Sequence, residues 1–168
     1  MADFLSDKWR IPLKSSSGDV VYGKGQAQKN QVVIAKPQTY MNLSGTPLRR
    51  FNAEPEDLIV IHDDLDLPPG SVRVKFGGGT GGHKGLESIF ENLGHDRFIR
   101  IRCGIGRPPE GMETSDYVLG LFPEQDLELV RKQIENAGSA IELCLREGHV
   151  KAMNLFNRRQ KDVPEEKE

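Results

Sequence analysis

The arrangement of apolar residues predicts five strands in the first two thirds of the chain. Residues 57–62, DLIVIH, contain an unbroken apolar run, which is typical of a parallel strand covered on both faces. Residues 71–76, SVRVKF, alternate apolar and basic side chains and therefore predict a strand with one exposed face. Three other segments have the composition of strands: 20–22, 31–35 and 98–105.

Apolar residues recur every three to four positions in other segments, which predicts helices. One helix is predicted over 86–93, a longer one over 123–147 and a short one over 150–158. The first two are followed directly by a glycine, the residue that most often ends a helix. Residues 42–44 look like a helix entry with Ser44 as the N-cap. Strands that alternate with helices predict an α/β layer fold.

Length and composition are those of one globular domain. The chain has 168 residues, of which 36% are hydrophobic, and it has no apolar run near the roughly 18 residues that a membrane span needs. Residues 1–13 are too acidic and too interrupted for a signal peptide. Cys103 and Cys144 are far apart, and the four histidines are scattered, so no local metal motif is present. We therefore expect reduced thiols and a cytoplasmic location.

The charge balance changes when the C-terminus is considered separately. The formal net charge is −2, but residues 162–168 carry four acids and one lysine, so the remaining 161 residues carry a net charge of +1. We predict a domain over 1–161 and an acidic disordered tail over 162–168. A basic face on this body would suit a phosphate backbone. Its predicted members are Arg100, Arg102, Arg107, Arg131, Lys132, Arg158 and Arg159, although Arg100 and Arg102 have the alternative of pairing with acids across the sheet.

Residues 77–82 are unusually rich in glycine, with five glycines in six positions directly before a predicted helix. The spacing fits a dinucleotide-binding fingerprint, but the segment lies mid-chain and the next strand has no acid after it. A phosphate-binding P-loop is excluded because His83 stands where a glycine is needed. A plain flexible turn needs fewer glycines. We favour a segment whose backbone closely approaches a ligand at a helix N-terminus.

Two other clusters suggest chemistry. Asp63 follows a buried strand, where ligands of open α/β sheets bind, and a carboxylate there can orient a catalytic imidazole. The alternatives are a solvated turn, or a metal site formed with Asp64 and Asp66 that has too few ligands. Tyr40 offers a stacking face and Asn42 both a donor and an acceptor. Taken alone, the second cluster is better explained as a cap beside a core methionine.

Taken together, these motifs resemble those of the bacterial peptidyl-tRNA hydrolases. The resemblance extends to about residue 161 and rests on four segments in series: KPQTYMNLSG (36–45), HDDLDLPPG (62–70), GGGTGGHKGL (77–86) and RIRCGIGRP (100–108). It implies a monomeric α/β domain with a twisted mixed sheet flanked by helices. It also implies cleavage of the ester between a peptide and the 3′ ribose of tRNA, which recycles tRNA from stalled translation. No metal, cofactor or membrane is implied.

The resemblance also implies roles for individual residues. Asp63 is the catalytic-site residue that holds a histidine in its basic form. Tyr40 and Asn42 contact the 3′ end of the substrate, and Met41 lies in the wall of the site. Two further residues, His83 and Lys84, line the substrate-binding loop. Lys84 departs from the family, in which asparagine is the commonest residue and contacts substrate.

The histidine that acts as general base has no counterpart in this sequence. The family begins with a strand, a Gly-Asn-Pro-Gly segment and an Arg-His-Asn that contains the base, whereas ADFLSDKWRIPL (2–13) resembles the helix that follows them. We therefore expect the first strand to be missing and the chain to be nearly inactive. Two alternatives remain, a non-catalytic module that binds the tRNA end or a phosphate, and a nucleotide-dependent oxidoreductase.

Overall fold

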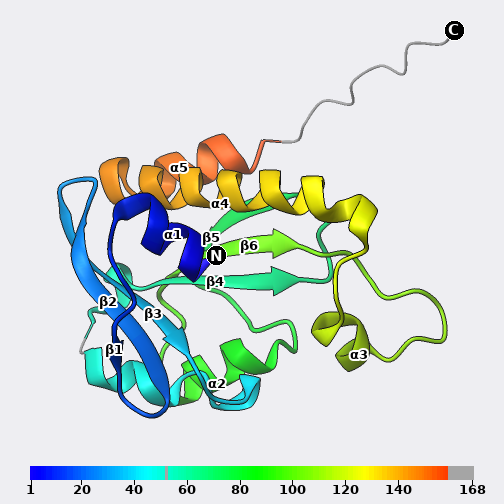
Figure 1. Cartoon of the computed structure of the whole chain (residues 1–168), viewed down its shortest axis with the longest axis horizontal. Coiled ribbons are helices and arrows are strands. Elements are labelled where there is room, and N and C mark those ends of the chain that lie inside the picture. Colours follow the sequence, from blue (N-terminus) through cyan, green and yellow to red (C-terminus); the bar gives the residue numbers. More distant parts are fainter. Residues whose placement is uncertain (52, 159–168) are drawn as a thin grey trace, which may run out of the picture.

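The computed structural model describes residues 1–51 and 53–158, and the predicted tail over 162–168 lies outside them. Helices and strands alternate along the chain (Figure 1). The helices are α1 (Ala2–Trp9), α2 (Lys84–Leu93), α3 (Thr114–Leu119), α4 (Leu127–Glu147) and α5 (His149–Phe156). The strands are β1 (Ser15–Ser16), β2 (Val20–Ala27), β3 (Asn30–Pro37), β4 (Ile59–Asp64), β5 (Val72–Phe76) and β6 (Ile99–Gly104). Short 3₁₀ helices are η1 (Met41–Leu43), η2 (Thr46–Phe51), η3 (Pro55–Asp57) and η4 (Glu124–Asp126).

The strands form two three-stranded sheets. One has the order β1-β2-β3 and is antiparallel, with β2 and β3 joined by a tight turn. The other has the order β4-β6-β5, in which β6 is central, β4 runs parallel to it and β5 antiparallel. All five predicted strands are present. The mixed α/β architecture is therefore confirmed.

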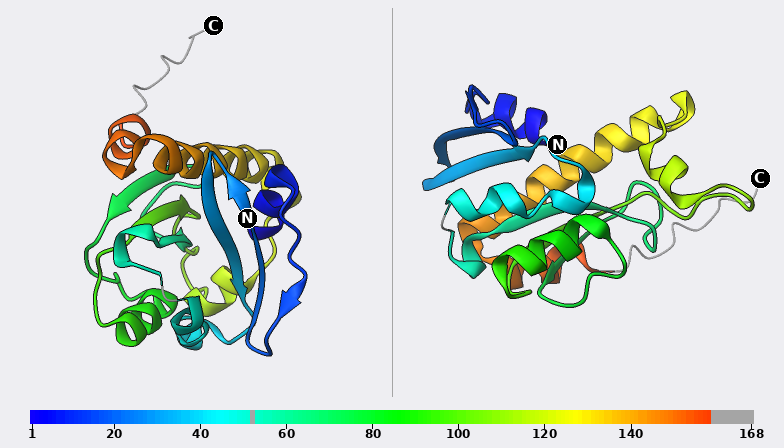
Figure 2. Two further views of the ribbon diagram at one scale, coloured as in Figure 1. Left: turned by 90° about the vertical axis from the view of Figure 1, so that its left-hand side faces the viewer. Right: turned by 90° about the horizontal axis from the view of Figure 1, so that it is seen from below.

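Helices cover the β4-β6-β5 sheet on both faces. Helices α4 and α5 lie on one side of it and α2 on the other (Figures 1 and 2). Ile59 and Ile61 of β4 face the larger core with α1, α4 and α5, whereas Val60 faces a smaller core built around Leu86, Ile89 and Phe98. The parallel strand is thus apolar on both faces because it contacts a core on each side, as predicted.

Helices α2 and α4 end at the glycines that the sequence predicted. Gly94 ends α2 with φ 74° and Gly148 ends α4 with φ 84°, a conformation that costs glycine little. The helix predicted to begin after residues 42–44 is present as a 3₁₀ helix, η2, but the N-cap role predicted for Ser44 is wrong. Ser44 ends η1 by donating from Oγ to the Met41 carbonyl at 2.8 Å. Gly45 approaches α2 so closely that a Cβ atom would lie 2.2 Å from the Ser88 carbonyl oxygen.

Within residues 1–51 and 53–158, no helix combines the length and the apolar character needed to cross a bilayer. The same residues contain no cluster of three or more His, Cys, Asp or Glu side chains that could hold a metal ion. Cys103 and Cys144 are both free thiols, and burial raises the pKa of each to about 11.

Candidate functional site

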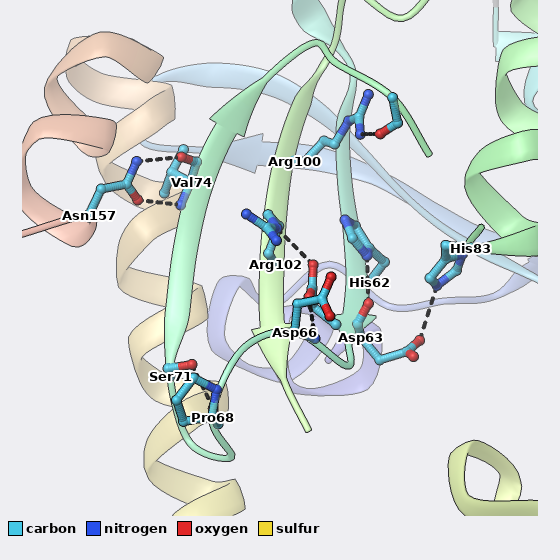
Figure 3. Close-up of polar contacts among 12 residues, drawn as sticks. His62, Asp63, Asp66, Pro68, Ser71, Val74, His83, Arg100, Arg102 and Asn157 are labelled. Carbon is cyan, nitrogen blue, oxygen red and sulfur yellow. Dashed lines mark hydrogen bonds and ion pairs between the residues drawn. The ribbon is translucent and has the colours of Figure 1, made fainter. Parts of the chain in front are cut away.

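The structure brings Asp63 and His83 together from elements that are twenty residues apart. Asp63 is near the carboxyl end of β4, and His83 directly precedes α2. The Nε2 atom of His83 lies 3.2 Å from Oδ1 of Asp63 (Figure 3). Both side chains remain partly accessible, at 28% for Asp63 and 18% for His83. A strand exit therefore faces a helix N-terminus, the arrangement in which α/β proteins commonly bind ligands.

His83 is the N-cap of α2. Its Nδ1 atom accepts hydrogen bonds from the backbone N–H groups of Gly85 at 3.1 Å and Leu86 at 3.3 Å. Gly81 and Gly82, with φ of 61° and 80°, bring the chain into this position. The sequence placed His83 and Lys84 in a loop, but Lys84 is the first residue of the helix.

His62 precedes Asp63 on β4 and contacts both members of this pair. Its Nδ1 atom is 2.7 Å from the carbonyl oxygen of Asp63, and its ring meets the ring of His83 edge-on at 5.0 Å (Figure 3). Its Nε2 atom is buried and has no hydrogen-bond partner in the described part of the chain. Burial lowers the pKa of His62 to about 4, because the charged imidazole would lose its hydration. His62 is therefore neutral near pH 7.

The two neighbouring carboxylates are both held as anions. The hydrogen bond from His83 lowers the pKa of Asp63 and outweighs the opposing effect of burial. Burial acts against the ionisation of Asp64, but the Arg102 guanidinium, with Nε 2.7 Å from Oδ2, lowers its pKa overall. The predicted charge at this strand exit is thus partly neutralised by a partner on β6, and Asp63 keeps the more accessible carboxylate.

Arg100 holds the glycine-rich segment rather than extending a basic face. The residue is 2% exposed and donates from NH1 to the carbonyl of Gly79 at 2.7 Å and from NH2 to the carbonyl of Gly78. Its guanidinium carbon lies 5.1 Å from the ring centres of both Phe90 and Phe98. The prediction that Arg100 binds nucleic acid is therefore wrong. The physical reason is that its guanidinium is buried against the glycine-rich segment and the rings of Phe90 and Phe98.

The alternative given for Arg102, pairing with an acid across the sheet, is confirmed by its contact with Asp64. Arg100 instead pairs with backbone carbonyls, which sequence reasoning missed. Arg107 and Lys132 pair with Asp66 and Glu128 at the surface, and the remaining basic face stays a prediction.

The segment 40–42 lies beside the same helix N-terminus. Helix η1 packs against α2, with Sδ of Met41 2.7 Å from the point where a Cβ atom on Gly85 would stand. Tyr40 is 84% exposed, and Asn42 is exposed as well. Lys84 is also exposed, and its Nζ pairs with Oε2 of Glu87 at 2.9 Å. The predicted site residues thus converge on the first turn of α2 from three parts of the chain.

Comparison with known proteins identifies related molecules along almost the whole chain. The family model described as peptidyl-tRNA hydrolase matches residues 1–164. The chain is 42% identical to the peptidyl-tRNA hydrolase of Brevibacillus brevis over 159 residues, 92% of this chain and 84% of the relative. It is 41% identical to that of Bacillus subtilis over 159 residues, 92% and 85% of the two chains. A crystal structure of peptidyl-tRNA hydrolase from Acinetobacter baumannii superposes with a TM-score of 0.81 at 35% identity, over 94% of this chain and 82% of that one.

Proposed function

This chain belongs to the peptidyl-tRNA hydrolase family, and we propose that the cluster of Asp63, His83 and the segment 40–42 is its substrate site. Enzymes of this family are hydrolases that act on the ester bond of peptidyl-tRNA. The observation that carries the assignment is the carboxylate of Asp63, ionised and partly accessible, at the point where β4 meets the first turn of α2. The site would hold the ester between the peptide and the 3′ ribose of tRNA.

Asp63 has the properties required of a group that orients a histidine base. An ionised carboxylate that accepts an imidazole N–H holds the ring in the tautomer whose other nitrogen can take a proton from water. General-base catalysis of this kind contributes about 10²–10⁴-fold to a rate. An aminoacyl-type ester is intrinsically labile, so an activated water together with stabilisation of the oxyanion is sufficient for its hydrolysis.

Neither imidazole beside Asp63 suits the role of that base. The pKa of His62, about 4, is far below the operating pH at which a general base is most effective. Both ring nitrogens of His83 are already in hydrogen bonds. We therefore expect the 168-residue chain to bind its substrate but to hydrolyse it slowly.

We propose that the exposed segment 40–42 and the start of α2 contact the 3′ end. Tyr40, with its ring almost fully accessible, can stack on a base, and Asn42 can hydrogen-bond to a base or the ribose. Met41 would form the wall between these residues and α2. Lys84 can exchange its surface contact with Glu87 for a phosphate, and His83 lies at the centre of the site.

A tRNA substrate agrees with the family to which the chain belongs. We propose that the chain acts as a monomer in the cytoplasm, with peptidyl-tRNA as its partner and without a metal ion or a membrane. Sedimentation of the chain with and without tRNA would test the stoichiometry. A dimer in the absence of tRNA would contradict this proposal.

The site can be tested with a non-hydrolysable analogue in which an amide links an N-acetyl-aminoacyl group to the 3′ position of adenosine. We expect backbone NMR signals to shift at residues 40–42 and 83–85 when the analogue is added. Unmodified adenosine is the control, because it lacks the peptide-like group and should shift fewer signals. Shifts confined to other parts of the molecule would contradict the assignment.

Turnover separates the enzyme from a non-catalytic binding module. Hydrolysis of N-acetyl-aminoacyl-tRNA should be measured next to the Bacillus subtilis relative under the same conditions. We expect this chain to be more than about tenfold slower, because general-base catalysis is worth at least about that factor. A rate within tenfold of the relative would contradict the expectation. Binding of the analogue without any turnover would favour the non-catalytic binding module. Failure to bind the analogue would contradict both the enzyme and the binding module.

A further inference from the structure

His83 makes hydrogen bonds with both ring nitrogens, and the partners differ in kind. The Nδ1 atom faces two backbone N–H groups, those of Gly85 and Leu86, which can only donate. The Nε2 atom faces Oδ1 of Asp63, a carboxylate oxygen that can only accept when it is ionised. The ring proton must therefore be on Nε2, and the lone pair on Nδ1. This contact set defines one tautomer of the imidazole.

The same ring thereby joins two elements that no backbone hydrogen bond connects within residues 1–51 and 53–158. The carboxyl end of β4 carries Asp63 (Figure 3). The N-terminus of α2 supplies the two N–H groups. Serine, threonine, aspartate or asparagine usually provides the capping acceptor. Each of these is too short to cap the helix and also reach Asp63, whereas an imidazole presents two nitrogens on opposite sides of a rigid ring.

We propose that His83 is a positioning residue, which fixes the Asp63 carboxylate to the N-terminus of α2 as the Nε2–H tautomer. Its role in hydrolysis rests on the proposed function of Asp63. With Oδ1 held by His83, the oxygen left to receive the N–H of a base is Oδ2. The position of that oxygen is then set relative to the segment 40–42, because η1 packs on the same helix turn.

His62 supports this arrangement from the side. It donates from Nδ1 to the Asp63 carbonyl at 2.7 Å, and its ring packs edge-on against His83. The backbone of Asp63 is thus held by one histidine and its side chain by the other. A substrate contact by His83 would require the ring to give up either the helix cap or Asp63.

Two substitutions separate the two bonds. In His83→Asn the side-chain oxygen takes the place of Nδ1, so the cap is kept and the contact with Asp63 is lost. In His83→Gln the amide nitrogen can reach the place of Nε2, so the contact with Asp63 is kept and the cap is lost. The pair therefore forms a matched control, each variant preserving what the other removes.

Two NMR measurements and one thermal melt, all on the tRNA-free chain, test the proposal. Long-range ¹H–¹⁵N spectra of the unmodified chain should show the Nε2–H tautomer for His83. Titration of the Asp63 carboxyl carbon should show its pKa raised in His83→Asn, because the hydrogen bond that lowers it is gone, and little changed in His83→Gln. His83→Gln should instead lower Tm by about 2–4 °C, the loss of one helix cap in a chain of this length.

The proposal is overturned if His83 carries its proton on Nδ1, or if His83→Asn leaves the titration of Asp63 unchanged. In the same way, a Tm in His83→Gln equal to that of the unmodified chain would show that His83 does not cap α2. None of these measurements uses tRNA. A chain that fails to bind the 3′-amide analogue but shows the expected titrations would contradict the proposed function and leave this inference standing.

Discussion

The two edges of the β4-β6-β5 sheet are protected very differently. At the β5 edge, Asn157 acts like an added strand residue, because its Oδ1 accepts from the Val74 N–H at 2.9 Å and its Nδ2 donates to the Val74 carbonyl at 2.7 Å (Figure 3). Arg73 adds a hydrogen bond to the carbonyl of Phe156 at 3.1 Å. Strand β4, in contrast, pairs only with β6, and no strand among the described residues pairs with its other edge.

Burial follows the same division. Val74 of β5 is 1% exposed and Ile101 of the central strand is fully buried, whereas all six residues of β4 are only partly buried. This is so although β4 is apolar on both faces and contacts both cores. Covering both faces of a strand therefore does not bury it while one edge remains open. Asp63, the central residue of the candidate site, is on this less supported strand.

The strongest test of the comparison is amide hydrogen exchange. We expect the amides of residues 58–61 to exchange at least ~100-fold faster than those of Val74 and Ile101, because an unpaired edge opens locally at low cost. NMR-detected exchange measures this directly, with the β6 amides as the internal reference. Equal protection on both edges, together with a sharp cooperative melt, would show that the fold closes without a further strand beside β4.

Removing the contacts that protect the β5 edge should lower the free energy of unfolding measurably. Asn157→Ala removes the partners of two backbone groups on the buried Val74, at a cost of about 1–3 kcal/mol for each group that stays buried and unpaired. Because water can reach part of the new edge, we expect a total near 2–3 kcal/mol in urea unfolding. Asn154→Ala on the exposed side of α5 is the matched control. A loss no larger than in this control would mean that Asn157 does not protect the edge.

The histidine on the open strand should make stability depend on pH. The pKa of His62 is lowered by burial to about 4, from an unfolded value near 6.5, so the unfolded chain binds the additional proton first. Stability is therefore complete above pH 6.5 and is lost as the pH falls toward 4. After an allowance for partial exposure we expect a loss of about 2 kcal/mol between pH 7 and pH 4.5.

His62→Asn is the control for this pH dependence. Its side-chain amide can still donate to the Asp63 carbonyl but does not titrate, so its stability should stay nearly constant over the same range. Urea unfolding at the two pH values checks both proteins. An equal loss in the variant would assign the effect to other groups.

The smallest effect is expected at the rim of the site. Lys84 pairs with Glu87 on the helix surface, and its side chain is 70% exposed. Lys84→Ala should therefore change the free energy of unfolding by less than about 0.5 kcal/mol, while it removes a charge proposed to meet a tRNA phosphate. Thermal melts and tRNA affinity at two salt concentrations measure both consequences. A loss as large as that of Asn157→Ala would contradict the distinction between surface pairs and edge contacts.

Local patterns in the sequence were sufficient for most elements. The apolar run at 57–62 and the alternation at 71–76 predicted β4 and β5, and the glycines at 94 and 148 predicted the ends of α2 and α4. These signals are local, since side-chain periodicity and glycine conformations depend on near neighbours in the chain. The four motif segments likewise predicted the family, which the comparisons confirm.

The places where prediction failed depend on contacts between distant residues. Gly45, between the two 3₁₀ helices, lies against the backbone of Ser88, and Arg100 is buried where it meets the glycine-rich segment and two phenylalanine rings. The tautomer-defining contacts of His83 require Asp63 and α2 to meet. Patterns in the sequence thus predict most of the elements, the family and the side chains available for chemistry. Which sheet edge is protected and which groups pair depends on the fold, because burial and hydrogen bonding require neighbours supplied by other segments.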